Sequence, residues 1–175
     1  IRARTTYQHP DMINKPPLST EQPIPLPAPS EGKRGEAGHL GYLLRQAAAA
    51  QRLRMERALA DLPITAPQFA LLTMLDAYPG SSNAELARLT LLTPQTVSPM
   101  VTNLERSGLL ARTPHLQHGR IQQLSLSPAG ATLLAEAKAR VARLEQELAA
   151  PLSEEELLLV KRWLANLASG MEGEV

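Results

Sequence analysis

The sequence predicts a mainly α-helical protein with one small β-hairpin, and three observations lead to this fold class. Apolar residues recur at helical spacing over most of the chain from residue 38 onward. Capping residues stand where several of these helices would begin. Between residues 82 and 130, a short helix, a tight turn, a second helix, a hairpin and the start of another helix follow one another. This order predicts a winged helix-turn-helix (α+β) with further helices on both sides.

The first elements follow from apolar spacing and helix caps. Apolar residues keep a helical spacing over residues 38–62, and Pro63 ends the pattern. Thr65–Gln68 fits a capping box, in which two side chains satisfy the free backbone N–H groups of a helix start. The helix that begins there is expected to run to Tyr78. A second capping box at Ser82–Glu85 starts the short helix of the helix-turn-helix.

The next elements complete the winged motif. Thr93-Pro94 supplies an N-cap followed by a proline in the first turn, so a helix is expected over residues 93–107. Gly108 stands where a left-handed residue would end that helix. Strands are expected near residues 109–114 and 120–126. The remaining helices are expected from Ser127-Pro128 to Pro151 and from a capping box at Ser153–Glu156 onward.

The helix at 93–107 has one apolar face and one polar face. Val97, Val101 and Leu104 share the side that should be buried. The opposite side carries amide, hydroxyl and guanidinium groups, which can pair with base edges and phosphates of duplex DNA. An isolated helix of this kind would more often be plain solvated surface, but its place between a turn and a hairpin favours DNA reading. The candidate DNA-binding residues are Thr93, Gln95, Thr96, Ser98, Pro99, Thr102, Asn103, Arg106, Arg112, His118 and Arg120.

Two details of this region invite special explanations. Pro99 lies beyond the first turn of its helix, where it removes a backbone hydrogen bond and is expected to bend the reading surface. His115 and His118 form an HxxH pair, which suggests a metal site. Two histidines without neighbouring carboxylates make a poor site, so exposed polar residues of the hairpin tip are the preferred interpretation and no metal or cofactor is expected. Arg120 at the tip is placed to enter a minor groove.

Composition and periodicity divide the chain into three parts. Residues 1–37 hold seven of the 15 prolines and are expected to be a Pro-rich extension. The sequence does not decide whether residues 1–11 are native or come from a tag or an upstream sequence. A linker is the simpler expectation and a strap on a partner subunit is the alternative. Residues 63–126 form the predicted DNA-binding region. Residues 38–62 and 127–171 have more apolar surface than this region can bury, which predicts a helical dimerisation region and a homodimer rather than a monomer with packed terminal helices.

Composition also excludes several classes of protein. The chain has no cysteine, so disulfides and thiolate metal sites are absent. A formal net charge of +1 does not fit a general polyanion binder, so DNA contacts must come from a few placed arginines. No apolar run approaches the roughly 20 residues that cross a bilayer, and no signal peptide is evident, so a cytoplasmic protein is expected. The sequence shows no nucleophile–base pair and no phosphate-binding loop, so an enzyme is not expected.

Residues from about Thr65 to Gly130 resemble the MarR (multiple antibiotic resistance regulator) family of bacterial transcription factors. The resemblance rests on "ITAPQFALL", on "NAELARLTLLTPQTVSPMVTNLERSGLLAR", on Arg120 and on "LSLSPAG", and the flanking helices extend it to about residues 38–170. It implies a homodimer that binds palindromic operators, usually as a repressor. Three departures put the operator sequence in question: His118 replaces the usual wing aspartate, Pro99 and Asn103 stand where relatives are often basic, and Thr113 replaces a second basic residue.

In that family a small molecule commonly binds between the dimerisation helices and the DNA-binding region, and its binding releases the DNA. The residues expected to line such a site for a small aromatic or anionic effector are His39, Tyr42, Arg45 and Phe69. Ordinary core and dimer packing is the alternative role of these four residues. A winged helix that binds protein rather than DNA is the main alternative function, and a copper- or zinc-responsive regulator also remains open. The sequence does not define the effector, the target genes or the sign of regulation.

Overall fold

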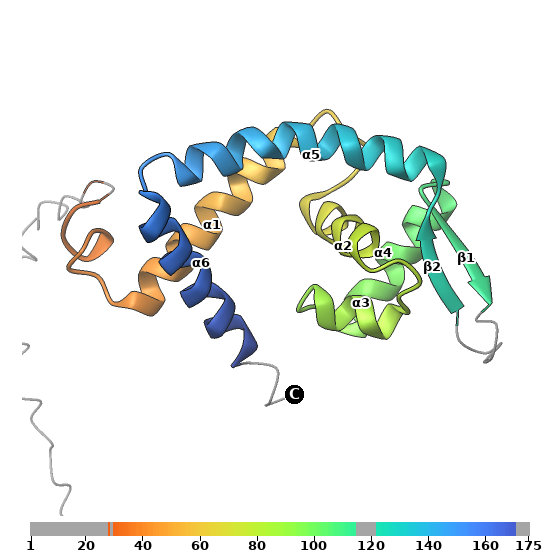
Figure 1. The fold of residues 1–175 in the computed structure, drawn as a ribbon, viewed down its shortest axis with the longest axis horizontal. Coiled ribbons are helices and arrows are strands. Elements are labelled where there is room, and N and C mark those ends of the chain that lie inside the picture. Colours follow the sequence, from red (N-terminus) through yellow and green to blue (C-terminus); the bar gives the residue numbers. More distant parts are fainter. Residues whose placement is uncertain (1–27, 29, 115–121, 171–175) are drawn as a thin grey trace, which may run out of the picture. The chain divides into compact units, whose positions relative to one another are not determined.

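The computed structural model describes residues 28, 30–114 and 122–170. The chain forms two compact units, one up to Leu44 and one from Arg45 onward. The described elements are predominantly α-helices with a single antiparallel pair of strands, which confirms the predicted fold class (Figure 1). Their bounds are η1 Gly32–Arg34, α1 Leu40–Ala58, α2 Ala66–Ala77, α3 Asn83–Leu89, α4 Pro94–Arg106, β1 Leu110–Pro114, β2 Gln122–Leu126, α5 Pro128–Ala149 and α6 Glu154–Ser169.

Most helices begin where their capping residues predict. Capping boxes are present at Thr65–Gln68, Ser82–Glu85 and Ser153–Glu156. In the second of these, Ser82 N donates to Glu85 Oε2 at 2.7 Å and Glu85 N donates to Ser82 Oγ at 3.3 Å. The backbone hydrogen bond from Ser82 also lowers the pKa of Glu85. Gly108 has φ +70° after α4, as expected of a helix-ending glycine.

The first long helix is shorter than predicted. Apolar spacing suggests a helix up to Leu62, whereas α1 ends at Ala58. A turn follows, in which Leu62 N donates to Leu59 O at 2.9 Å. Leu59 is 2% exposed and Ile64 is 6% exposed, so the turn brings both into the core. Burial of these side chains and the restriction imposed by Pro63 therefore override the helical spacing of the last residues.

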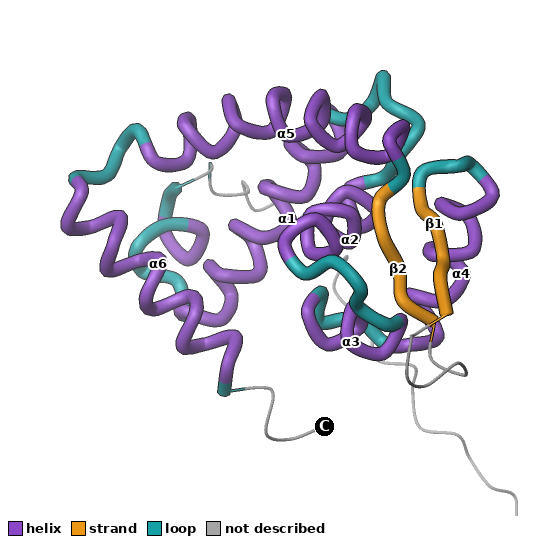
Figure 2. The backbone as a smooth tube through the Cα atoms, turned by 45° about the vertical axis from the view of Figure 1, so that its right-hand side comes forward, coloured by secondary structure: helices purple, strands orange, loops and turns teal. Residues whose placement is uncertain are grey.

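The helix-turn-helix lies beside the hairpin and α5 (Figure 2), and a hydrophobic core joins them. Helix α2 contacts α3, α5 and β2, while α4 contacts α3 and β1. Leu71, Leu72, Leu86, Val97 and Val101 are fully buried. The core thus fixes α4 from its inner side and leaves its other side to solvent.

The hairpin is in register from Leu110↔Leu126 to Pro114↔Gln122. A short backbone segment before α3 extends it: Gly80 N donates to Leu124 O at 2.9 Å, and Leu124 N donates to Ser81 O at 3.2 Å. Leu124 is 1% exposed. The hairpin is therefore attached to the helix-turn-helix both by backbone hydrogen bonds and by buried side chains.

The two C-terminal helices differ in burial. Helix α5 buries Leu134, Ala137 and Val141. Helix α6 buries none of its residues, although its sequence is rich in large apolar side chains. Those at least one-third exposed on α6 are Leu158, Leu159, Val160, Trp163, Leu164 and Leu167. Over the part of the chain that the structure describes, no helix is both long and apolar enough to cross a membrane.

Candidate nucleic-acid interface

Helix α4 is amphipathic, and the structure orients it as its sequence predicts. Val97 and Val101 are 0% exposed and Leu104 is 1% exposed. The polar residues of the predicted reading face are exposed to solvent. They are Gln95, Pro99, Thr102, Asn103 and Arg106.

The beginning of α4 is held by its own hydroxyl groups. Thr96 N donates to Thr93 Oγ1 at 3.3 Å, and the two threonine hydroxyls lie 3.0 Å apart. Both side chains belong to exposed residues. Thr93 and Thr96 therefore cap the helix and remain accessible to a ligand at its N-terminal end.

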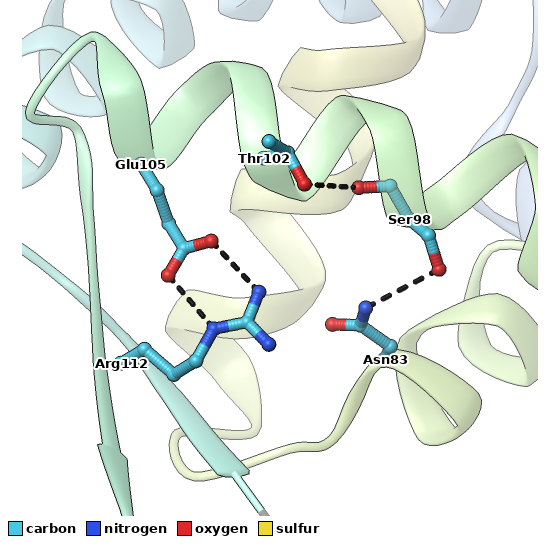
Figure 3. Close-up of polar contacts among 5 residues, drawn as sticks. All are labelled: Asn83, Ser98, Thr102, Glu105 and Arg112. Carbon is cyan, nitrogen blue, oxygen red and sulfur yellow. Dashed lines mark hydrogen bonds and ion pairs between the residues drawn. The ribbon is translucent and has the colours of Figure 1, made fainter.

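The middle of α4 is tied to α3 and to its own preceding turn (Figure 3). Asn83 Nδ2 donates to Ser98 Oγ at 3.4 Å, and Thr102 Oγ1 donates to Ser98 O at 3.0 Å. Helix α4 continues through Pro99 without interruption. These contacts link α4 to α3 through the Ser98 hydroxyl and hold the Thr102 hydroxyl against the preceding turn of α4.

Asn103 is held by a residue that the sequence suggested only as a helix cap. Gln68 Nε2 donates to Asn103 Oδ1 at 3.5 Å, while Gln68 Oε1 accepts from Thr65 N at 2.8 Å. Gln68 therefore serves the capping box of α2 and the orientation of Asn103 together. Arg106 is exposed at the C-terminal end of α4 and is the only basic residue of this helix.

Arg112 on β1 forms a bidentate ion pair with Glu105 on α4 (Figure 3). Nε donates to Oε1 at 2.8 Å and Nη2 donates to Oε2 at 2.7 Å. The side chains of Arg112 and Glu105 are 32% and 26% exposed. The hydrogen bond with Arg112 lowers the pKa of Glu105, and the same bond raises the pKa of Arg112. Glu105 was not among the predicted site residues, because no helical or strand periodicity relates two residues seven apart across a turn.

The structure does not describe the tip of the predicted hairpin. His118 and Arg120 lie outside the described residues, as does His115. Among the residues that the structure does describe, no group of three or more histidine, aspartate and glutamate side chains is arranged to hold a metal ion.

The four candidate effector residues are divided between the two units of the chain. His39 is exposed just before α1 and Tyr42 is partly buried within it, both in the first unit. In the second unit Arg45 is exposed, whereas Phe69 is 8% exposed and packs in the hydrophobic core. A hollow of about 290 Å³ beside α3 and one of about 300 Å³ beside the start of α2 have none of these residues in their linings.

Comparisons with known proteins agree with this geometry. A family model described as MarR family matches residues 64–121. An HTH-type transcriptional repressor of Mycobacterium tuberculosis is 36% identical over 130 residues, which cover 74% of this chain and 94% of the relative. The fold also matches solved structures of transcriptional regulators.

Two examples are structures that were solved with a bound partner. The transcriptional repressor CouR, bound to a 23-mer DNA duplex, has a TM-score of 0.71 and 33% identity, with 79% of this chain and 99% of that chain covered. The PcaV transcriptional regulator from Streptomyces coelicolor, in complex with its natural ligand, has a TM-score of 0.67 and 29% identity, with 76% and 94% covered. The sequence resemblance and the winged helix-turn-helix are therefore confirmed, and the chain belongs to the MarR family.

Proposed function

We propose that this protein is a dimeric transcriptional repressor that binds palindromic duplex DNA through α4. The observation that carries the proposal is the exposed polar face of α4, held rigidly on a buried apolar face and flanked by the β1–β2 hairpin. A helix presented in this way fits a major groove. The DNA-bound structure of CouR, a relative with the same fold, supports this role.

The side chains on that face suggest a division of tasks. Gln95 and Asn103 carry amides, which can donate to and accept from adenine together, so they are proposed to read base edges. Thr93, Thr96, Ser98 and Thr102 offer hydroxyl groups for bases or phosphates, and Pro99 offers an apolar surface for a thymine methyl group. Arg106 is proposed to contact phosphate. His118 and Arg120 are proposed to act at the hairpin tip, with Arg120 in the flanking minor groove.

A homodimer accounts for the exposed apolar side chains of α6. Trp163 is 39% exposed and Leu164 is 42% exposed, which is costly for large apolar groups unless a partner covers them. Two-fold symmetry would place two copies of α4 in successive major grooves, about 34–36 Å apart. A palindromic operator is the expected partner of such an arrangement.

We further propose that a small aromatic or anionic molecule weakens DNA binding. The ligand complex of PcaV supports a ligand-responsive member with this fold. His39, Tyr42, Arg45 and Phe69 remain sequence-based candidates for the effector site. Because allosteric coupling is reciprocal, operator DNA should weaken effector binding by the same factor by which the effector weakens DNA binding. Because the proposed partner is DNA, we also propose that the protein is associated with the bacterial nucleoid.

A protein-interaction module is the second candidate function, and the scarcity of cations favours it. Helix α4 carries one basic residue, and the guanidinium of Arg112 is paired with Glu105. A winged helix that binds a protein surface would need no phosphate contacts. This alternative predicts no salt-dependent affinity for any duplex.

Selection of binding sites from random duplex DNA with the purified full chain tests the proposal. We expect enrichment of a palindrome whose half-sites lie about one helical turn apart. Gln95→Ala should change the base preference at one symmetric pair of positions and leave the others unchanged, with Glu145→Gln on α5 as a control that changes none. Failure to enrich any sequence, together with salt-independent behaviour, would favour the protein-interaction module.

A further inference from the structure

The Glu105–Arg112 pair connects helix α4 with the β1–β2 hairpin, the two elements that would meet DNA. Glu105 lies on α4 and Arg112 lies on β1 of the hairpin, with a helix end and the Gly108 turn between them. Both oxygens of the carboxylate accept hydrogen bonds, at 2.8 and 2.7 Å, from two different nitrogens of the guanidinium. Such bidentate pairing fixes orientation as well as distance.

The register of the hairpin shows on which side Arg112 lies. Arg112 is paired with Leu124, and directly paired residues of an antiparallel ladder project from the same face. Leu124 is 1% exposed, and Leu110, two residues before Arg112, is 5% exposed. Arg112 therefore projects from the core-facing side of the hairpin, whereas its neighbours Ala111 and Thr113 project from the exposed side.

The pair carries no net charge. An arginine that neutralises a DNA phosphate needs an unpaired charge, and the guanidinium of Arg112, although 32% of its side chain is exposed, is already paired with the Glu105 carboxylate. A second polar contact reaches the middle of α4, where the Asn83 amide of α3 donates to Ser98 Oγ at 3.4 Å. Polar contacts thus join the middle of α4 to α3 and its C-terminal end to the hairpin (Figure 3).

From this geometry we propose that Arg112 and Glu105 are positioning residues: together they hold the hairpin against α4, and Arg112 is not a phosphate ligand. This inference rests on the proposed function, because it assigns Arg112 a task within DNA binding that differs from the one its charge suggests. The two assignments predict opposite results for the removal of Glu105.

The positioning role and the phosphate-ligand role of Arg112 can be separated by measuring operator affinity between about 50 and 200 mM salt. The variants to compare are Glu105→Gln, Arg112→Gln and the double variant. If Glu105 merely masks a phosphate ligand, Glu105→Gln frees a cation and tightens binding. If the pair positions the hairpin, each single variant weakens binding about fivefold, the size of a partly exposed ion pair, and the double variant is no weaker than either. Arg112→Gln then leaves the salt slope unchanged, whereas Arg106→Gln lowers it by about one as the matched control. Glu145→Gln controls for the loss of a negative charge.

Hydroxyl-radical footprints distinguish positioning from a general loss of structure. The single variants should lose protection at the outer flanks of the operator and keep it at the centre of each half-site. Uniform fading of all protections, tighter binding by Glu105→Gln, or a lowered salt slope in Arg112→Gln would overturn the inference. Absence of salt-dependent binding by the wild-type protein would instead refute the proposed function, and this inference with it.

Discussion

Gly130 in the first turn of α5 is a position where alanine should destabilise the protein, although alanine is normally the better helix former. A Cβ built on Gly130 would lie 2.0 Å from Leu109 O and 2.9 Å from Leu109 C. Both are backbone atoms of the segment that leads into β1. Since ordinary contacts begin at 3.4 Å, helix and backbone would have to separate by about 1.4 Å.

The cost follows from what this separation would break. Ser127 N donates to Leu109 O at 3.1 Å and Ser127 Oγ donates to Gly108 O at 2.6 Å. Loss of two hydrogen bonds costs about 2 kcal/mol, and overpacking costs about 1–3 kcal/mol. The intrinsic preference for alanine offsets about 1 kcal/mol. We therefore expect the free energy of unfolding to fall by about 2–4 kcal/mol, or about 4–16 °C in Tm for a chain of this length.

Urea denaturation and thermal melts of Gly130→Ala at fixed protein concentration measure the effect. Gly41→Ala is the matched control, because Gly41 also lies in the first turn of a helix and its Cβ would meet no atom within 4 Å. This control should be stabilised by about 0.5–1 kcal/mol. If Gly130→Ala proved as stable as Gly41→Ala, the close approach of α5 to Leu109 would be refuted.

Three further predictions concern backbone strain, charge and assembly. Leu91 has φ +53°, so Leu91→Gly should raise the free energy of unfolding by about 0.5–1 kcal/mol and Leu91→Val should lower it; equal melts for both would contradict this. The hydrogen bond from Arg112 lowers the pKa of Glu105 in the folded protein. The ionised carboxylate therefore contributes to the free energy of unfolding at pH values above its ordinary pKa of 4.5, and this contribution is lost as the pH falls through the folded-state pKa. The stability gap between wild type and Glu105→Gln should thus shrink from pH 7 to pH 3 in urea titrations, and a constant gap would count against it. Leu164→Glu should shift the protein towards monomer in sedimentation velocity, whereas exposed Lys161→Glu should not.

Local chemistry explains how much of the fold could be predicted from the sequence. Capping boxes join residues three apart, so Ser82–Glu85 and Ser153–Glu156 define helix starts without any tertiary information. The end of α1 could not be found in this way, because the burial of Leu59 depends on distant residues. The exposed face of α4 was predictable because helical periodicity alone places Val97 and Val101 on one side.

The polar contacts of the reader were less accessible to sequence reasoning. The pairing of Glu105 with Arg112 depends on the turn at Gly108 and on the register of the hairpin, which are properties of the folded chain. The bond from Gln68 to Asn103 joins residues 35 positions apart. In both cases the contact joins residues that no helical or strand periodicity of the sequence relates.

The single basic residue of α4 has a consequence for how the protein would find its operator in the cell. Chromosomal DNA offers roughly a million or more competing sites, and their hold on a protein comes almost entirely from phosphate contacts. A reader with Arg106 alone on its helix, and with Arg112 neutralised by Glu105, would spend little time on arbitrary sequence. Fewer copies per cell would then be sequestered by the genome, and those released from an operator would return to free solution.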